Sequence, residues 1–92
     1  MNTVFVRFLV DADASAGLLS KVVQPFARRD ITPDRMWSHR NGETVHLEVA
    51  VEQMPKQDIH LVAGNLQQVI GVRSVTAVVR DSNTNHLHDL SV

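Results

Sequence analysis

Residues 11–17 (DADASAG) hold the residue types in this chain that are best suited to binding a small charged ligand. They precede an apolar pattern of helical period, so the unpaired backbone N–H groups of a helix start are expected there. Such groups favour a carboxylate, and Gly17 lets a ligand come close to the backbone. A second interpretation stays open, in which Gly17 only allows tight packing of the helix on a strand.

Asp11 and Asp13 are the nearest approach to a catalytic carboxylate pair. A helix start explains them without catalysis, because Asp13 or Ser15 can cap the free N–H groups. The chain contains no GxSxG, HExxH, GxxxxGK[ST] or GxGxxG motif. The sequence therefore predicts neither an enzyme nor a cofactor.

Five histidines raise the question of a metal site. His39 and His46 are expected on the same sheet face without being directly paired, while His86 and His88 lie in a polar C-terminal segment. Spacing fixes no third ligand, and the absence of cysteine excludes thiolate sites and disulfides. We predict solvated or interface histidines and no bound metal.

The composition is that of one globular domain close to neutrality, with 92 residues, 9 Lys and Arg, and 10 Asp and Glu. This balance argues against nucleic acid as a partner, because no excess of cations faces the phosphates. No apolar run reaches the roughly 20 residues that span a bilayer. The N-terminus has no signal-peptide pattern, which predicts a cytoplasmic protein. A chain this short often gains stability by self-association.

Hydrophobic periodicity predicts four strands and two helices. The strands are expected at residues 3–10, 34–40, 43–51 and 72–80. The first helix is expected to end at residues 28–30, with Pro25 disturbing its last turn. The second helix is expected to begin with Pro55 in its first turn and to be closed by Gly71.

Asn41-Gly42 predicts a type I′ hairpin turn, because both turn positions then need positive φ. The pairs expected on one face are Arg40 with Glu43, Ser38 with Val45, and Met36 with Leu47. Those expected on the other face are Arg35 with Glu48, Trp37 with His46, and His39 with Thr44. The opposite charges of Arg35 and Glu48 favour this register.

The order β-α-β-β-α-β predicts an α+β ferredoxin-like sandwich over residues 1–80, followed by a flexible tail at residues 81–92. Its four-stranded antiparallel sheet has the expected strand order 4-1-3-2, with both helices on one face. The opposite face would expose a mixed apolar and polar patch, which usually marks a contact surface. The interface residues predicted there are Phe5, Leu9, Trp37, His39, His46 and Val78.

The run SAGLLSKVVQPFARRDITPDRMWSHR (residues 15–40) resembles the first helix and second strand of an ACT domain. The residues that carry the likeness match in order: Gly17, Leu19, Ser20, Lys21, Val22, Phe26, Arg29 and Ile31. The likeness spans about residues 3–80 and is strongest to the short, single-domain regulatory small subunit of acetolactate synthase. Asp30 stands where the family has a glycine, and aspartate adopts the left-handed conformation more readily than most residues.

The resemblance implies a non-catalytic module that pairs, often into one eight-stranded sheet, and binds an amino acid at the subunit interface. Carried over position by position, the effector site comprises Asp13, Ser15, Ala16, Gly17 and Leu18, with Thr32 and Pro33 from the partner chain. The resemblance further implies a catalytic partner subunit, a thiamine-diphosphate enzyme of branched-chain amino acid biosynthesis.

We therefore expect a regulatory module, a homodimer or tetramer, that responds to a small amino acid and modulates a partner enzyme. A ligand-free protein-interaction module of the same fold stays open as the alternative. A small enzyme of this fold is a third hypothesis, which no residue pattern supports.

Overall fold

The computed structural model describes residues 2–80, which form four strands and two helices in the predicted order. The strands are β1 (Thr3–Asp13), β2 (Arg35–Asn41), β3 (Thr44–Pro55) and β4 (Val72–Arg80). The helices are α1 (Leu18–Ala27) and α2 (Ile59–Gln67), and a short 3-10 turn, η1 (Lys56–Asp58), precedes α2. The tail predicted at residues 81–92, with His86 and His88, lies outside the described residues.

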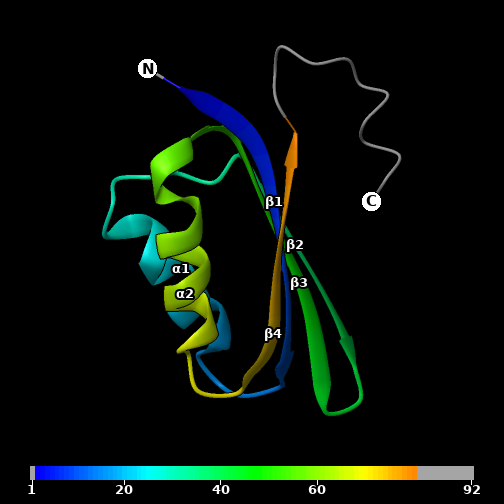
Figure 1. The fold of residues 1–92 in the computed structure, drawn as a ribbon. Coiled ribbons are helices and arrows are strands. Elements are labelled where there is room, and N and C mark those ends of the chain that lie inside the picture. Colours follow the sequence, from blue (N-terminus) through cyan, green and yellow to red (C-terminus); the bar gives the residue numbers. More distant parts are fainter. Residues whose placement is uncertain (1, 81–92) are drawn as a thin grey trace.

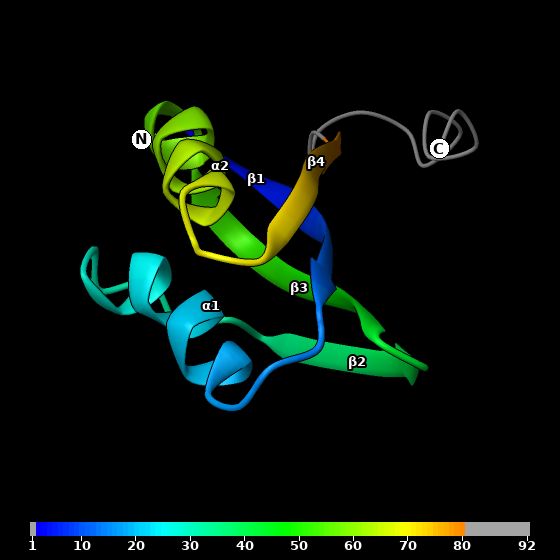
Figure 2. The ribbon, with the colours of Figure 1, turned by 90° about the horizontal axis from the view of Figure 1, so that it is seen from below.

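The four strands form one antiparallel sheet in the order β2-β3-β1-β4, which is the predicted order seen from the other edge. Both helices cover the same side of this sheet, and the other side carries no helix (Figure 1). The view along the strands shows β1 and β3 in the middle, with β2 and β4 at the edges (Figure 2). The predicted ferredoxin-like sandwich is confirmed.

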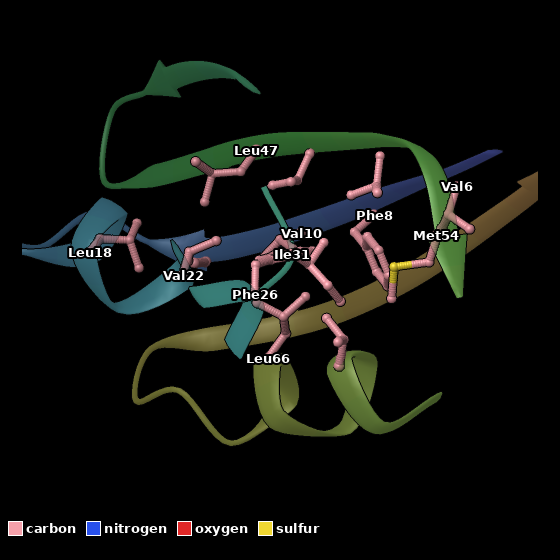
Figure 3. Packing of buried hydrophobic residues seen from close by; sticks show 14 of the residues in the cluster. Val6, Phe8, Val10, Leu18, Val22, Phe26, Ile31, Leu47, Met54 and Leu66 are labelled. Atoms are coloured by element: carbon pink, nitrogen blue, oxygen red, sulfur yellow. The ribbon is translucent and has the colours of Figure 1, made fainter. Parts of the chain in front are cut away.

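The core lies between the sheet and the helices (Figure 3). The even-numbered residues of β1, from Val4 to Ala12, are each at most 2% exposed. Phe8 meets Phe26 of α1 edge to face, with ring centroids 5.3 Å apart, a favourable geometry for aromatic pairs. The other buried residues of the strands and helices are Leu18, Val22, Pro25, Leu47, Val49, Val51, Met54, Val62 and Leu66.

The side of the sheet that faces away from the helices is called the open face below. The side chains of the odd-numbered residues of β1 and of their cross-strand neighbours point to this face. Its residues from β1 and β4 are Phe5, Arg7, Leu9, Asp11, Ser74, Thr76, Val78 and Arg80. Its residues from β2 and β3 are Arg35, Trp37, His39, His46, Glu48 and Ala50. The faces predicted for these strands are confirmed.

The predicted hairpin turn is wrong by one residue, which shifts the cross-strand pairing by two. Gly42 and Glu43 form the turn, and Asn41 pairs with Thr44. A glycine with positive φ (64°) at the first turn position is typical of a type II′ turn. The Thr44 hydroxyl donates to the Asn41 carbonyl (3.0 Å) and Arg40 Nε to the Gly42 carbonyl (2.9 Å), so side chains fasten this register.

The shift changes the partners of the hairpin residues but not their faces. Arg35 lies opposite Ala50 rather than Glu48, and Trp37 lies opposite Glu48. His39 and His46 are directly paired, contrary to the prediction. Because side chains alternate with a period of two, a slip of two residues leaves every side chain on its predicted face.

The start of α1 also differs from the prediction. Neither Asp13 nor Ser15 caps the helix, because β1 continues through Asp13 and the cap residue is Gly17. At the other end, Asp30 adopts φ 57°, in agreement with its predicted left-handed conformation. Pro55 ends β3 instead of lying in the first turn of α2, which begins only at Ile59.

Two leucines on α2 provide a matched test of this core. Leu66 is fully buried, whereas Leu61 is 44% exposed. Leu66→Ala should lower the free energy of unfolding by about 2–5 kcal/mol, because it leaves a cavity. Leu61→Ala should change it by less than about 0.5 kcal/mol. Urea unfolding curves measure both, and equal effects would contradict the packing of α2 on the sheet.

Candidate functional site

A cavity of about 680 Å³ lies where the chain passes from β1 into α1 and borders the far end of β2. Its lining residues are Ala14, Ser15, Ala16, Gly17, Leu18, Leu19, Ser20, Ser38, Arg40 and Val45. Arg40 is the one charged side chain in this lining, beside serine hydroxyls and a set of small or aliphatic groups. The cavity therefore offers positive charge at one wall and an apolar surface at another.

Gly17 shapes the mouth of this cavity through its backbone. It has φ 78°, a left-handed conformation that glycine adopts without steric cost. A Cβ built at Gly17 would meet no atom within 4 Å. The interpretation that Gly17 permits tight packing against a strand is therefore wrong, and the space beside it is open to a ligand.

The structure brings together four of the predicted effector residues, Ser15, Ala16, Gly17 and Leu18. Asp13 does not line the cavity, and its carboxylate contacts Arg73 at 2.6 Å. Thr32 lines a different cavity, of about 320 Å³, near the start of β2.

Pro33, the other residue predicted to come from the partner, does not line the first cavity. Within one chain, the two halves of the predicted site therefore lie at opposite ends of β2. The sequence interpretation missed Ser38 and Arg40, although period-two alternation places both on the helix side of the hairpin.

A second concentration of polar groups crosses the open face. Arg7 Nη1 lies 3.4 Å from Glu48 Oε1, and Glu48 Oε2 lies 3.1 Å from His46 Nε2. His46 Nδ1 lies 2.9 Å from Asp11 Oδ1, and Asp11 Oδ2 accepts a hydrogen bond from the Ser74 hydroxyl at 3.2 Å. A continuous chain of polar contacts therefore connects β3, β1 and β4.

The two carboxylates beside His46 change its titration. The hydrogen bond to Asp11 raises the pKa of His46 above its usual 6.5, and Glu48 acts in the same direction. The hydrogen bond from His46 lowers the pKa of Asp11, and Ser74 adds to this effect. His46 is therefore held between two carboxylates, which favour its protonated, cationic form.

The predicted interface residues differ in exposure. Trp37 is 51% exposed, stacks on His39 and meets the His46 ring at its edge. Phe5 is half-buried beneath the Arg80 guanidinium, which lies 4.4 Å from the ring centroid. Leu9 and Val78 are also half-buried. Within residues 2–80, no three His, Asp or Glu side chains converge as ligands for a metal ion.

A family model described as an ACT-like domain matches residues 1–85. The chain belongs to the ACT-like domain family. ACT domains are generally regulatory, non-catalytic modules and typically bind ligands. The ACT domain predicted from residues 15–40 is confirmed, whereas the likeness to the acetolactate synthase subunit stays a prediction.

Solved structures agree with this ACT-like fold. The ACT domain of GTP pyrophosphokinase from Chlorobium tepidum has a TM-score of 0.71 at 9% identity and covers 83% of this chain and 99% of that one. An ACT domain protein from Streptococcus pneumoniae has a TM-score of 0.68 at 16% identity, covering 85% and 91%.

A homoserine dehydrogenase from Thiobacillus denitrificans has a TM-score of 0.74 at 15% identity, and the match covers 86% of the ACT-like chain but 18% of the enzyme. No curated protein matches the chain in sequence. Neither helix of the described ACT-like domain is long and apolar enough to cross a membrane.

The Asp11–His46 contact makes the stability of the ACT-like domain depend on pH. A raised His46 pKa contributes stability below about pH 6.5, and this contribution is lost as the pH rises through the raised value. Asp11→Asn should lower the His46 pKa and reduce the loss of Tm between pH 6 and pH 8.

NMR titration of the His46 ring measures this effect directly. Asp13→Asn is the matched control, because the Asp13 carboxylate contacts Arg73 instead of His46. An unchanged His46 midpoint in Asp11→Asn would show that the ion pair is absent in solution.

Proposed function

We propose that this ACT-like domain is a regulatory module that self-associates and binds a small amino acid at the interface between two chains. The observation that supports it is the cavity of about 680 Å³, where the start of α1 meets the end of β2. Cavities of this size accommodate small metabolites.

The lining of this cavity fits the parts of an amino acid. Its carboxylate is suited to the positive end of α1 and to Arg40. Ser15 and Ser38 offer hydroxyls to the ammonium group, since a hydroxyl accepts as well as donates hydrogen bonds. An aliphatic side chain would lie against Leu18 and Val45.

Pairing of two β2 strands would complete the site. β2 is an edge strand, and all seven of its residues are exposed. In an antiparallel pair, the segment before β2 of one chain lies beside the end of β2 of the other. Thr32 of the partner subunit would then approach Arg40 and the mouth of the cavity.

We further propose that the regulated partner is the catalytic subunit of a thiamine-diphosphate enzyme such as acetolactate synthase. The support is the resemblance in residues 15–40 to that enzyme's small subunit. Mixing the purified proteins tests it: formation of a complex and a change in turnover are expected. Absence of both would reject this partner and leave the amino-acid site as a separate question.

A thermal-shift screen with the twenty amino acids tests the effector site. A ligand at about 100 times its Kd contributes about 2.7 kcal/mol, which raises Tm in a domain of this size by about 11–22 °C. Ala16→Leu should abolish the shift by filling the cavity. Ala27→Leu is the control, because Ala27 is exposed at the end of α1 outside the cavity.

Mixing two inactive variants tests whether the site is shared between chains. Thr32→Arg should also abolish the shift, although Thr32 does not line the cavity of its own chain. A mixture with Ala16→Leu should recover part of it, because mixed pairs contain one intact site. No shift with any amino acid for the folded wild type would favour the ligand-free interaction module.

A further inference from the structure

The open face has a hollow beside a projection. The hollow, of about 350 Å³, lies over Ala50, whose small side chain is flanked across the sheet by Arg7 and Arg35. Phe5 and Trp37 stand at its sides, and the Trp37 ring is half exposed. A surface with both features can fit a copy of itself, as two-fold interfaces require.

Charge on the open face is mixed rather than of one sign. Arg7, Arg35 and Arg80 border the hollow together with three carboxylates, those of Asp34, Glu48 and Glu52. This neutral surface does not suit a polyanion or a strongly charged partner. It suits another face of mixed charge, where each sign finds its opposite.

Along β1, the two signs lie on either side of an apolar residue. Arg7 and Asp11 point to the open face with Leu9 between them, so about 13 Å of strand separates the charges. A second β1 laid over the first in the reverse direction, about 10 Å away, would set each Arg7 opposite an Asp11. Leu9 would then meet its own copy at the two-fold axis.

We propose that the open face is covered by the open face of a second copy of this chain, turned end to end so that Arg7 faces the partner's Asp11. His46 of each protomer, opposite Asp11, then lies over the hollow at Ala50 of the other. Trp37, opposite Glu48, lies in the row of the axis and meets its own copy. Glu48 lies near the axis, and its charge is offset within its own chain by Arg7 and His46.

This assembly is separate from the proposed β2 pairing and does not require an effector. β1 is the strand between β3 and β4, so its side chains lie away from both sheet edges. Edge pairing extends the sheet sideways and leaves the open face bare. The two contacts together would give an assembly of four chains, and the open face alone would give a dimer.

Charge reversal on β1 tests the proposal. Arg7→Asp brings two carboxylates together across the axis, and Asp11→Arg brings two guanidinium groups together. Each should weaken this association by roughly a hundredfold, because like charges in contact cost several kcal/mol. Mixing the two variants should restore it, since every pair in the mixed assembly is then of opposite sign. Sedimentation velocity measures the masses.

Lys56→Asp is the control for reversed charge, because Lys56 is exposed beside α2 on the helix side. Its assembly should match the wild type, and circular dichroism verifies that each variant folds. Wild-type mass in both single variants would overturn the proposal. Loss of assembly without recovery on mixing would also overturn it, and would indicate another occupant, such as residues 81–92 or an unrelated protein.

Thr76→Arg gives a test that leaves the polar contacts of β1 intact. Thr76 is exposed on β4 and lies opposite Leu9, in the row that contains the proposed axis. Two arginines there should lower the mass of the assembly, and an unchanged mass would contradict the proposal. Because Thr76 is far from the effector cavity, this variant should keep the wild-type thermal shift with an amino acid, which separates the two proposals.

Discussion

The alternation of side chains along β1 is the constraint on which the rest of the structure depends. β1 is hydrogen-bonded on both sides, and its even-numbered residues from Val4 to Ala12 are almost completely buried. A slip of one residue would turn Arg7 and Asp11 into an apolar core. The burial of one face therefore fixes which groups the other face presents, and with them the polar contacts around His46.

Those polar contacts make the open face suitable for burial against another surface. Arg7, Glu48, His46 and Asp11 satisfy one another within the chain. A charge that already has a partner loses less on leaving water than an isolated one. An interface on this face can therefore cover four ionisable groups without leaving one of them unpaired, while Trp37 and Leu9 supply apolar contact.

The sequence predicts the fold because the period of the apolar residues shows which face of each strand and helix is buried. The buried faces in turn determine how the helix layer packs on the sheet. The hairpin shows the limit of this reasoning. Its faces are predicted correctly although its pairing register is wrong by two residues, because burial excludes a one-residue slip of the register but not a two-residue slip. Asp11 and Asp13 are predicted in a turn at a helix start, with Asp13 or Ser15 as the cap, because aspartate favours turns. Contacts with His46 and Arg73, distant in sequence, hold them in a strand instead.

The candidate site was predictable in part for a related reason. Local sequence marks the small residues before α1, and Gly17 has the left-handed backbone that suits it. Arg40 enters the cavity only through the pairing of β2 with β3, and Thr32 would enter only through a second chain. No local pattern encodes either neighbour.

The exposed edge of β2 explains how a ligand would act in the proposed site. His39 and Arg40 place polar and charged groups on an edge strand, and such groups weaken pairing between edges. An effector carboxylate beside Arg40 would neutralise one of these charges and bind both chains. The binding free energy of the effector then adds to that of the edge contact. By linkage, the factor by which the effector strengthens pairing of the chains equals the factor by which pairing raises the affinity for the effector. Weak pairing is thus what makes such a module responsive, because a strong edge contact would form whether or not the effector were present.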